Sequence, residues 1–178
     1  MTELTISEVA ENEGIQEPVF FGVSVSKMII MSLFTFGLYN FYWFYKNFDQ
    51  WEKKYDGQTM PFMRALFSPI FAYSLFTSIN FELENKESGK KLQAGWLAAL
   101  YFVLNLIGIA PNPYWLISFL VVLPLLGANQ RINDLCSLEI LGYEPDSKLS
   151  WINWMFLLVG GALTLLMLIG LFLIPQNL

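Results

Sequence analysis

Residues 151–174 form a stretch of 24 residues without a charged side chain. An α-helix rises about 1.5 Å per residue, so roughly 20 such residues cross the hydrocarbon core of a bilayer. A second charge-free stretch, residues 92–130, is 39 residues long and is interrupted only by Ala110-Pro111-Asn112-Pro113. Proline cannot continue a helix, so this interruption predicts a tight turn. The two stretches therefore predict three transmembrane helices, at about 92–110, 114–130 and 151–174.

The composition agrees with a membrane protein and excludes several other classes. Of the 178 residues 55% are apolar and only 14% are charged, against roughly 25% in soluble domains. The single cysteine, Cys136, excludes an intramolecular disulfide, and the lack of histidine removes the commonest metal ligand and general base. The net charge of −5 argues against nucleic acid as a partner. With no phosphate-binding glycine loop and no nucleophile in a recognisable setting, we expect no catalytic, metal or cofactor site and no enzyme.

Three further segments complete the expected organisation. Residues 1–18 carry five glutamates and no basic residue, which predicts a disordered acidic tail before a single helical membrane domain, 19–178. Residues 28–45 are free of charge and just long enough to span. Residues 62–81 are rich in phenylalanine but also contain serines and Pro69, so they are expected to form an interfacial or re-entrant helix, or else a short span.

The ten lysines and arginines favour one arrangement of these segments, because cytoplasmic flanks collect basic residues. With five crossings the better orientation places six of them inside and four outside. If residues 65–81 stay on the cytoplasmic surface, nine lie inside and only Lys27 lies outside. The favoured prediction is therefore four transmembrane helices with both termini outside the cytoplasm; if 28–45 also fails to cross, all ten basic residues lie inside.

Residues 36–47, with the sequence Phe-Gly-Leu-Tyr-Asn-Phe-Tyr-Trp-Phe-Tyr-Lys-Asn, resemble the F-G-x-Y-x-x-Y-W-x-Y-K-N signature of a family of small, uncharacterised bacterial inner-membrane proteins. Residues 64–76 and 123–133 are similar to segments that recur in the same proteins. The resemblance implies a bacterial inner membrane and a multi-pass protein. It implies no activity, because that family, a domain of unknown function, has none assigned.

The aromatic run and the polar end of the fourth expected span supply candidate sites for lipid. Rings and cationic groups at the end of a span are typical of the membrane–water interface, and the same groups around an amine can hold a lipid headgroup. The residues expected to contact lipid or headgroups are Tyr39, Tyr42, Trp43, Tyr45, Lys46 and Arg131. Arg131 also lies three residues before Asp134 on one helical face, where the two side chains can pair.

Small and polar residues within the spans indicate where helices pack. Ala94, Gly95, Ala98 and Ala99 form overlapping small-xxx-small pairs, and Gly37 is expected at a bend or a close helix contact. The strongly polar side chains inside the spans are Asn40, Asn105 and Asn153, with hydroxyls such as Ser118 and Thr164. We expect Asn105 to form an interhelical hydrogen bond.

Acidic side chains suggest one metal site, which we consider and reject. Asp49, Glu52 and Asp56 share a helical face, and two carboxylates so placed can hold a divalent ion. Lys53 is close enough to neutralise them, so a solvated helix face is the better interpretation.

Two functions from different classes remain. The first is a non-catalytic accessory or scaffold protein that packs against itself or another membrane protein and contacts lipid. The second is a transporter or channel for a small neutral or lipidic substrate; no ionisable residue lies within the spans to couple it to an ion. An internal polar cavity favours the second function, whereas dry helix contacts favour the first.

Overall fold

A computed structural model describes residues 18–57, 60–111 and 113–173 of the chain. The regular secondary structure of these residues is helical, and an isolated β-bridge joins Val23 to Asp146. The predicted all-α class is confirmed. The elements are α2 (Val25–Phe34), α3 (Leu38–Tyr55), α4 (Pro61–Leu66), α5 (Ser68–Asn85), α6 (Ala94–Ile107), the 3₁₀-helix η1 (Tyr114–Val121), α7 (Val122–Glu139) and α8 (Trp151–Leu173).

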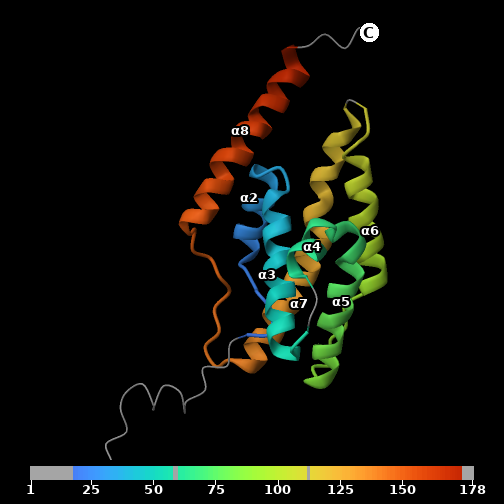
Figure 1. The fold of residues 1–178 in the computed structure, drawn as a ribbon, viewed down its shortest axis with the longest axis vertical. Coiled ribbons are helices and arrows are strands. Elements are labelled where there is room, and N and C mark those ends of the chain that lie inside the picture. The colour runs from blue at the N-terminus through green and yellow to red at the C-terminus, as the bar shows by residue number, and fades with distance from the viewer. Residues whose placement is uncertain (1–17, 58–59, 112, 174–178) are drawn as a thin grey trace, which may run out of the picture.

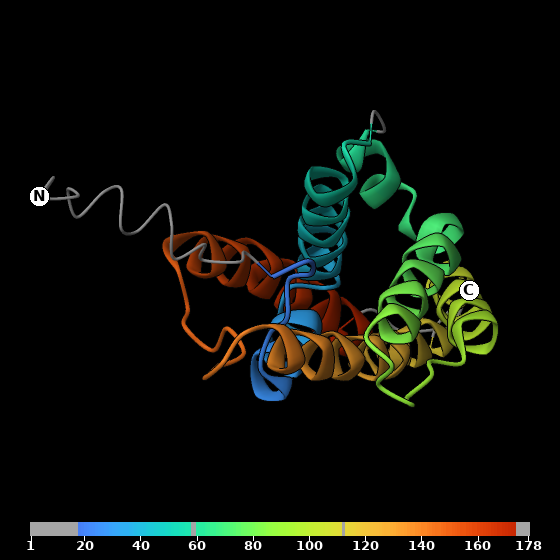
Figure 2. The same ribbon diagram turned by 90° about the horizontal axis from the view of Figure 1, so that it is seen from below.

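The helices form an elongated bundle with one crowded end (Figure 1). The C-terminal ends of α3, α5 and α7 lie together at the lower end, and α8 rises along one side to the opposite end. Viewed from below, α8 lies on the side away from α5 and α6, and the short α4 bridges the space between α3 and α5 (Figure 2). We call the lower end of the bundle in Figure 1 the charged end, because several ion pairs lie there, among them Lys54–Glu82, Lys86–Glu139 and Lys90–Asp134.

The expected span at residues 28–45 is not one helix. It is divided at residues 35–37, where the chain leaves α2 and turns into α3. Phe36 and Gly37 both have positive φ, of 52° and 81°, and two such residues in succession break a right-handed helix. Gly37 thus serves the turn, since a left-handed residue costs glycine least. This is the bend expected of Gly37; a Cβ there would meet only Asn40.

The chain reverses direction at this turn, so that residues 20–51 form a hairpin. Near the turn, Ser32 Oγ donates to Asn40 Oδ1 at 2.7 Å. Far from it, the Phe20 ring stacks on Trp51 with 5.4 Å between centroids. The two open ends of the hairpin therefore lie side by side. The 10 residues of α2 rise about 15 Å, which is half of a hydrocarbon core of about 30 Å.

The backbone that enters α2 is extended and buried, and side-chain amides satisfy it. Asn47 Oδ1 accepts from the backbone N–H of Phe21 at 3.0 Å, and its Nδ2 donates back to the Phe21 carbonyl. Asn129 from α7 does the same for Val23, accepting at 3.1 Å and donating at 2.7 Å, and Asn133 Nδ2 adds a second donor to that carbonyl at 3.0 Å. These amides take the place of a neighbouring strand on one edge of the segment, while the backbone of Asp146 pairs with the Gly22 carbonyl and the Ser24 N–H on the other edge.

Gly22 permits the close approach of this segment to α7. A Cβ at Gly22 would collide with Asn133 Oδ1 and with the hydroxyl of Tyr143. That hydroxyl donates to Asn133 Oδ1 at 3.1 Å, and burial raises the pKa of Tyr143 above its usual value, so the phenol keeps the proton that it donates. Tyr143, in the loop after α7, is therefore hydrogen-bonded to the same asparagine, Asn133, that binds the Val23 carbonyl.

Lys27 is placed differently from the favoured topology, which left it outside the cytoplasm. Its ammonium is buried and donates to Asp146 Oδ2 at 2.8 Å and to the Lys148 carbonyl at 2.7 Å. Lys27 therefore lies beside the loop that the same prediction places inside. The start of α2 is thereby held to the loop that precedes α8 by one ion pair.

The expected interfacial segment 62–81 divides into two helices. α4 ends at Phe67, which has φ −98° and ψ 33°, and Pro69 lies in the first turn of α5, where a missing N–H costs nothing. α5 runs in the same direction as α3, since Phe44 packs on Phe76 near the middle of both and Lys54 pairs with Glu82 near their ends.

One helix in the described part of the chain is both long and apolar enough to cross a membrane, namely residues 114–139, in which η1 continues into α7. Shorter apolar helices occupy Val25–Phe34, Ala94–Ile107 and residues 151–167. The helices expected at 92–110, 114–130 and 151–174 are therefore present as α6, η1 with α7, and α8, while residue 174 and the acidic tail up to residue 17 lie outside the described residues.

Gly160 gives a direct test of how α8 packs. A Cβ at Gly160 would lie 2.7 Å from the carbonyl carbon of Thr35 and still closer to its Cα, so the helix and the α2–α3 turn are in backbone contact. We expect Gly160→Ala to lower the free energy of unfolding in detergent by about 1–3 kcal/mol, as overpacking does in cores. Gly161→Ala is the matched control, because its Cβ would meet only the Phe34 carbonyl oxygen at 3.8 Å. Equal melting curves for the two variants would contradict this packing.

Candidate functional site

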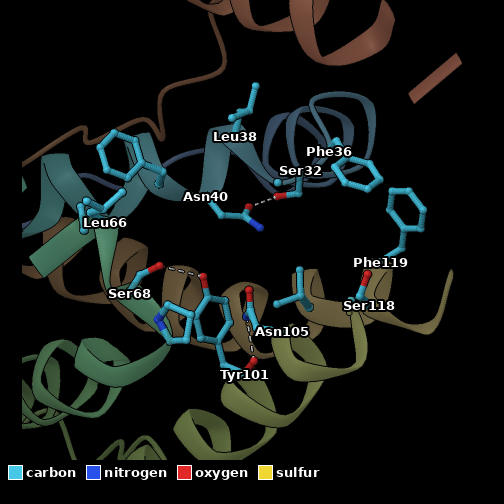
Figure 3. A pocket seen from close by; sticks show the side chains of 16 residues that line it. Ser32, Phe36, Leu38, Asn40, Leu66, Ser68, Tyr101, Asn105, Ser118 and Phe119 are labelled. Atoms are coloured by element: carbon cyan, nitrogen blue, oxygen red, sulfur yellow. Dashed lines mark hydrogen bonds between the residues drawn. The ribbon is translucent and has the colours of Figure 1, made fainter. Parts of the chain in front are cut away.

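A cavity of about 520 Å³ lies between the turn of the α2–α3 hairpin, the junction of α4 with α5, and the helices α6 and η1. Figure 3 shows side chains from these separate elements converging on it. Its volume is within the range of small-molecule sites, about 300–1,000 Å³. The lining residues are Ser32, Phe36, Gly37, Leu38, Asn40, Phe41, Ala65, Leu66, Ser68, Pro69, Tyr101, Asn105, Gly108, Ser118, Phe119 and Val121.

On the hairpin side of the cavity, Asn40 contributes a side-chain amide to the lining. Its side chain is buried, with 4% of the residue exposed. Oδ1 accepts from Ser32 Oγ, which fixes the amide so that Nδ2 points into the cavity (Figure 3). No hydrogen bond from Nδ2 is formed with the described residues, so this donor is available to a molecule in the cavity.

The opposite wall is polar as well, and it comes from α5 and α6. Ser68 Oγ and the Tyr101 hydroxyl lie 3.2 Å apart, and both residues are buried. Asn105 Nδ2 donates to the Tyr101 carbonyl at 2.8 Å, and Oδ1 is directed toward the cavity on the side of the Tyr101 hydroxyl, with which the Asn105 side chain also interacts (Figure 3). The interhelical hydrogen bond expected of Asn105 is thus replaced by a bond within its own helix.

The rim of the cavity is apolar. Leu38 and Leu66 are exposed, and Phe36 packs against Phe119 with 5.7 Å between ring centroids. None of the lining residues, all of which belong to the described part of the chain, is charged. Such a lining suits a neutral ligand, because a charge in this setting would lack a partner and would pay a large desolvation penalty.

The aromatic run expected at the membrane surface lies partly inside the protein. Tyr39 and Trp43, two of the residues expected to contact lipid, are fully buried within the bundle. Trp43 Nε1 instead donates to Asn129 Oδ1 at 3.3 Å. The two rings occupy positions i and i+4 of α3 and, with Asn47 one turn further, form the face that packs on the core.

The remaining residues of the expected lipid site are only half-buried. Tyr42, Tyr45 and Lys46 lie on the sides of α3, and Tyr42 packs its ring against Phe156 of α8. Arg131 donates to Asp134 at 3.1 Å, as their spacing of three predicts. Lipid contact at these four residues stays a prediction.

The small residues of α6 divide between two faces. Ala94 and Ala98 are buried within the bundle. Gly95 and Ala99 are exposed, and a Cβ at Gly95 would meet nothing within 4 Å. Only the first pair packs against a helix of the same chain.

The acidic face of α3 contains an ion pair. Asp49 pairs with Lys53 at 2.8 Å, the neutralisation that the spacing suggests. Within the described residues no group of three or more acidic or cysteine side chains is arranged to hold an ion.

The sequence identified part of this cavity and missed part of it. Asn40, Asn105 and Ser118 were recognisable as polar residues within apolar stretches. Ser68 and Tyr101 were not, because serine is common at an interface and a tyrosine in an apolar helix looks like a core residue. Comparison of the chain with family models, curated proteins and solved structures finds no match.

Three substitutions on α6 test the position of each side chain. Ala98→Leu should lower the free energy of unfolding in detergent by about 1–3 kcal/mol, because the added bulk enters the packed interior. Asn105→Leu should lower it by about 0.5 kcal/mol, the low end for a single hydrogen bond, since only a bond within the helix is lost, and Gly95→Leu should have no effect on the purified monomer. A large destabilisation by Asn105→Leu would instead support the interhelical hydrogen bond that the sequence predicts for Asn105.

Proposed function

We propose that this chain is a non-catalytic, multi-pass protein of the bacterial inner membrane, and that its cavity takes up a small neutral or lipidic molecule from the bilayer for transport. The single observation that carries the function is the cavity, whose polar interior and apolar rim suit such a molecule. The membrane assignment rests on the apolar helices, and the bacterial inner membrane on the resemblance of residues 36–47.

The distribution of exposed apolar side chains supports embedding of the upper part of the bundle. They cover α8, the outer faces of α6 and η1, and the short α4, including Leu158, Leu166, Phe102, Leu106 and Phe62. The ion pairs lie at the opposite, charged end. Trp96 and Trp151 are exposed at the starts of α6 and α8, where amphipathic rings favour a membrane–water interface.

The hairpin changes the topology that we favour. Because residue 20 lies against residue 51, the segment 20–51 begins and ends on the same side, and α2 alone is too short to cross. The crossings are then η1 with α7, α8, and the uncharged segment 92–110, in which the 14 residues of α6 rise about 21 Å and apolar residues continue on either side. This arrangement places all ten lysines and arginines on the cytoplasmic side, which is the strongest form of the basic-residue bias.

Single cysteines in a Cys136→Ser background test this topology. Cysteines at Pro18 and Ser147 should be protected from a membrane-impermeant thiol reagent in intact cells, because both lie on the cytoplasmic side. A cysteine at Asn112 should be labelled, because the turn between α6 and η1 lies outside. All three should react after permeabilisation. Labelling at Pro18 in intact cells would restore a crossing by residues 28–45.

A role as an accessory or scaffold subunit is the second candidate. It is favoured by the exposed small residues Gly95 and Ala99, which lie on α6 with open space around Gly95. Such a face allows a helix of another copy or another membrane protein to approach closely. Loss of a complex in mild detergent on Gly95→Leu, with the monomer equally stable, would support it.

Filling the cavity tests the uptake of a ligand. Ser118→Phe adds an aromatic ring to the lining, so a neutral molecule that co-purifies with the wild-type protein in mild detergent should be lost, as measured by native mass spectrometry. Ser137→Phe is the matched control, since Ser137 is an exposed serine of α7 away from the lining. Retention of the molecule by Ser118→Phe would show that it binds elsewhere and would remove the main support for the function.

A further inference from the structure

Asn40 and Asn105 present opposite hydrogen-bonding groups to the same cavity. Asn40 Nδ2 is a donor without a partner among the described residues, carried on the hairpin. Asn105 Oδ1 is an acceptor, carried on α6, because Nδ2 of that amide is engaged by the Tyr101 carbonyl. Figure 3 shows the two side chains directed toward one another from facing helices.

Each amide is held in orientation by a hydrogen bond to a neighbouring residue, and the oxygen of an amide has two lone pairs, so Oδ1 of Asn105 can accept from a ligand even beside the Tyr101 hydroxyl. Ser32 holds Oδ1 of Asn40, and the Tyr101 carbonyl holds Nδ2 of Asn105. A ligand that satisfies both free groups must itself contain an acceptor and a nearby donor. A carbonyl oxygen meets the first requirement, and a hydroxyl or an amide N–H meets the second.

The charge of the ligand follows from the lining. With no cationic side chain there, a phosphate or carboxylate would be buried without a counter-ion, which is far more costly than burying a hydroxyl that is hydrogen-bonded. The cavity of about 520 Å³ has room for a polar group and the first part of an acyl chain. The exposed Leu38 and Leu66 at the rim provide an apolar path for the rest of the chain toward the bilayer.

We propose that the cavity selects a neutral lipid in which an ester carbonyl lies next to a free hydroxyl, as in an acylglycerol, with Asn40 donating to the carbonyl and Asn105 accepting from the hydroxyl. This substrate class rests on the proposed function, since it requires that the cavity binds a lipid at all. It differs from a general apolar site because two polar contacts must be met together.

Binding of four matched lipids to the purified protein, measured by native mass spectrometry in mild detergent, tests the assignment. The probes are a monoacylglycerol, its alkyl ether without the carbonyl, the corresponding fatty-acid methyl ester without the hydroxyls, and the free fatty acid. The monoacylglycerol should bind about fivefold more tightly than the ether or the methyl ester, the size expected for one hydrogen bond. The ionised fatty acid should bind the most weakly.

Two variants assign the contacts to their residues. Asn40→Leu should abolish the preference for the monoacylglycerol over the ether, while binding of the ether shows that the cavity is intact. Asn105→Leu should abolish the preference over the methyl ester. Asn85→Leu, at an exposed asparagine near the end of α5, is the matched control and should keep both preferences.

The outcomes separate this inference from the function beneath it. If all four lipids bind equally and Ser118→Phe blocks them all, the cavity binds lipid but does not read the carbonyl and hydroxyl, so the inference is wrong and the function stands. Tightest binding of the fatty acid overturns the neutral class. If no lipid binds, or Ser118→Phe blocks none, both the inference and the proposed function are wrong.

Discussion

The pairing of asparagine amides with the extended backbone of residues 20–23 is the constraint on which the rest of the structure depends. Residue 146 pairs with one edge of this buried segment, and without further partners the N–H and C=O groups of the other edge would be unsatisfied, at a cost of about 1–3 kcal/mol for each group. Asn47 and Asn129 supply both a donor and an acceptor, as a neighbouring strand would. Residues 20–23 are hydrogen-bonded to Asn47 of α3 and to Asn129 of α7. These bonds hold the start of the hairpin beside the later turns of α3, so the hairpin begins and ends toward the charged end.

The hairpin in turn creates the cavity. Because α2 ends after 10 residues and the chain turns back, the tip of the hairpin stops within the bundle and leaves space between itself, α6 and η1. η1 is a 3₁₀-helix of 8 residues, which is long for that geometry, and its rings close the cavity against Phe36. A continuous transmembrane helix in place of α2 and α3 would carry Ser32 and Asn40 on an unbroken helix face and would leave no such tip.

The two proposed functions make different demands on the same helix. α6 presents Ala98 and Tyr101 inward, to the bundle and the cavity, and Gly95 outward. Uptake of a neutral lipid depends on the inward face, whereas assembly with another membrane protein depends on the outward one. The two are compatible in one molecule, because neither face contributes to the other's contacts.

The sequence by itself determined the all-α class, the apolar helices at α6, α7 and α8, and the ion pairs of Arg131 with Asp134 and of Lys53 with Asp49. Each of these follows from local properties: uninterrupted apolar length, or spacings of three and four residues on a helix. Tertiary structure alone decided that Tyr39 and Trp43 are core residues, that residues 28–45 form part of a hairpin, and that Ser68 and Tyr101 join Asn40 and Asn105 in one cavity. The physical reason is that the partners are distant in the chain: Asn129 reaches a backbone 106 residues earlier, and no local pattern indicates which asparagine will do so.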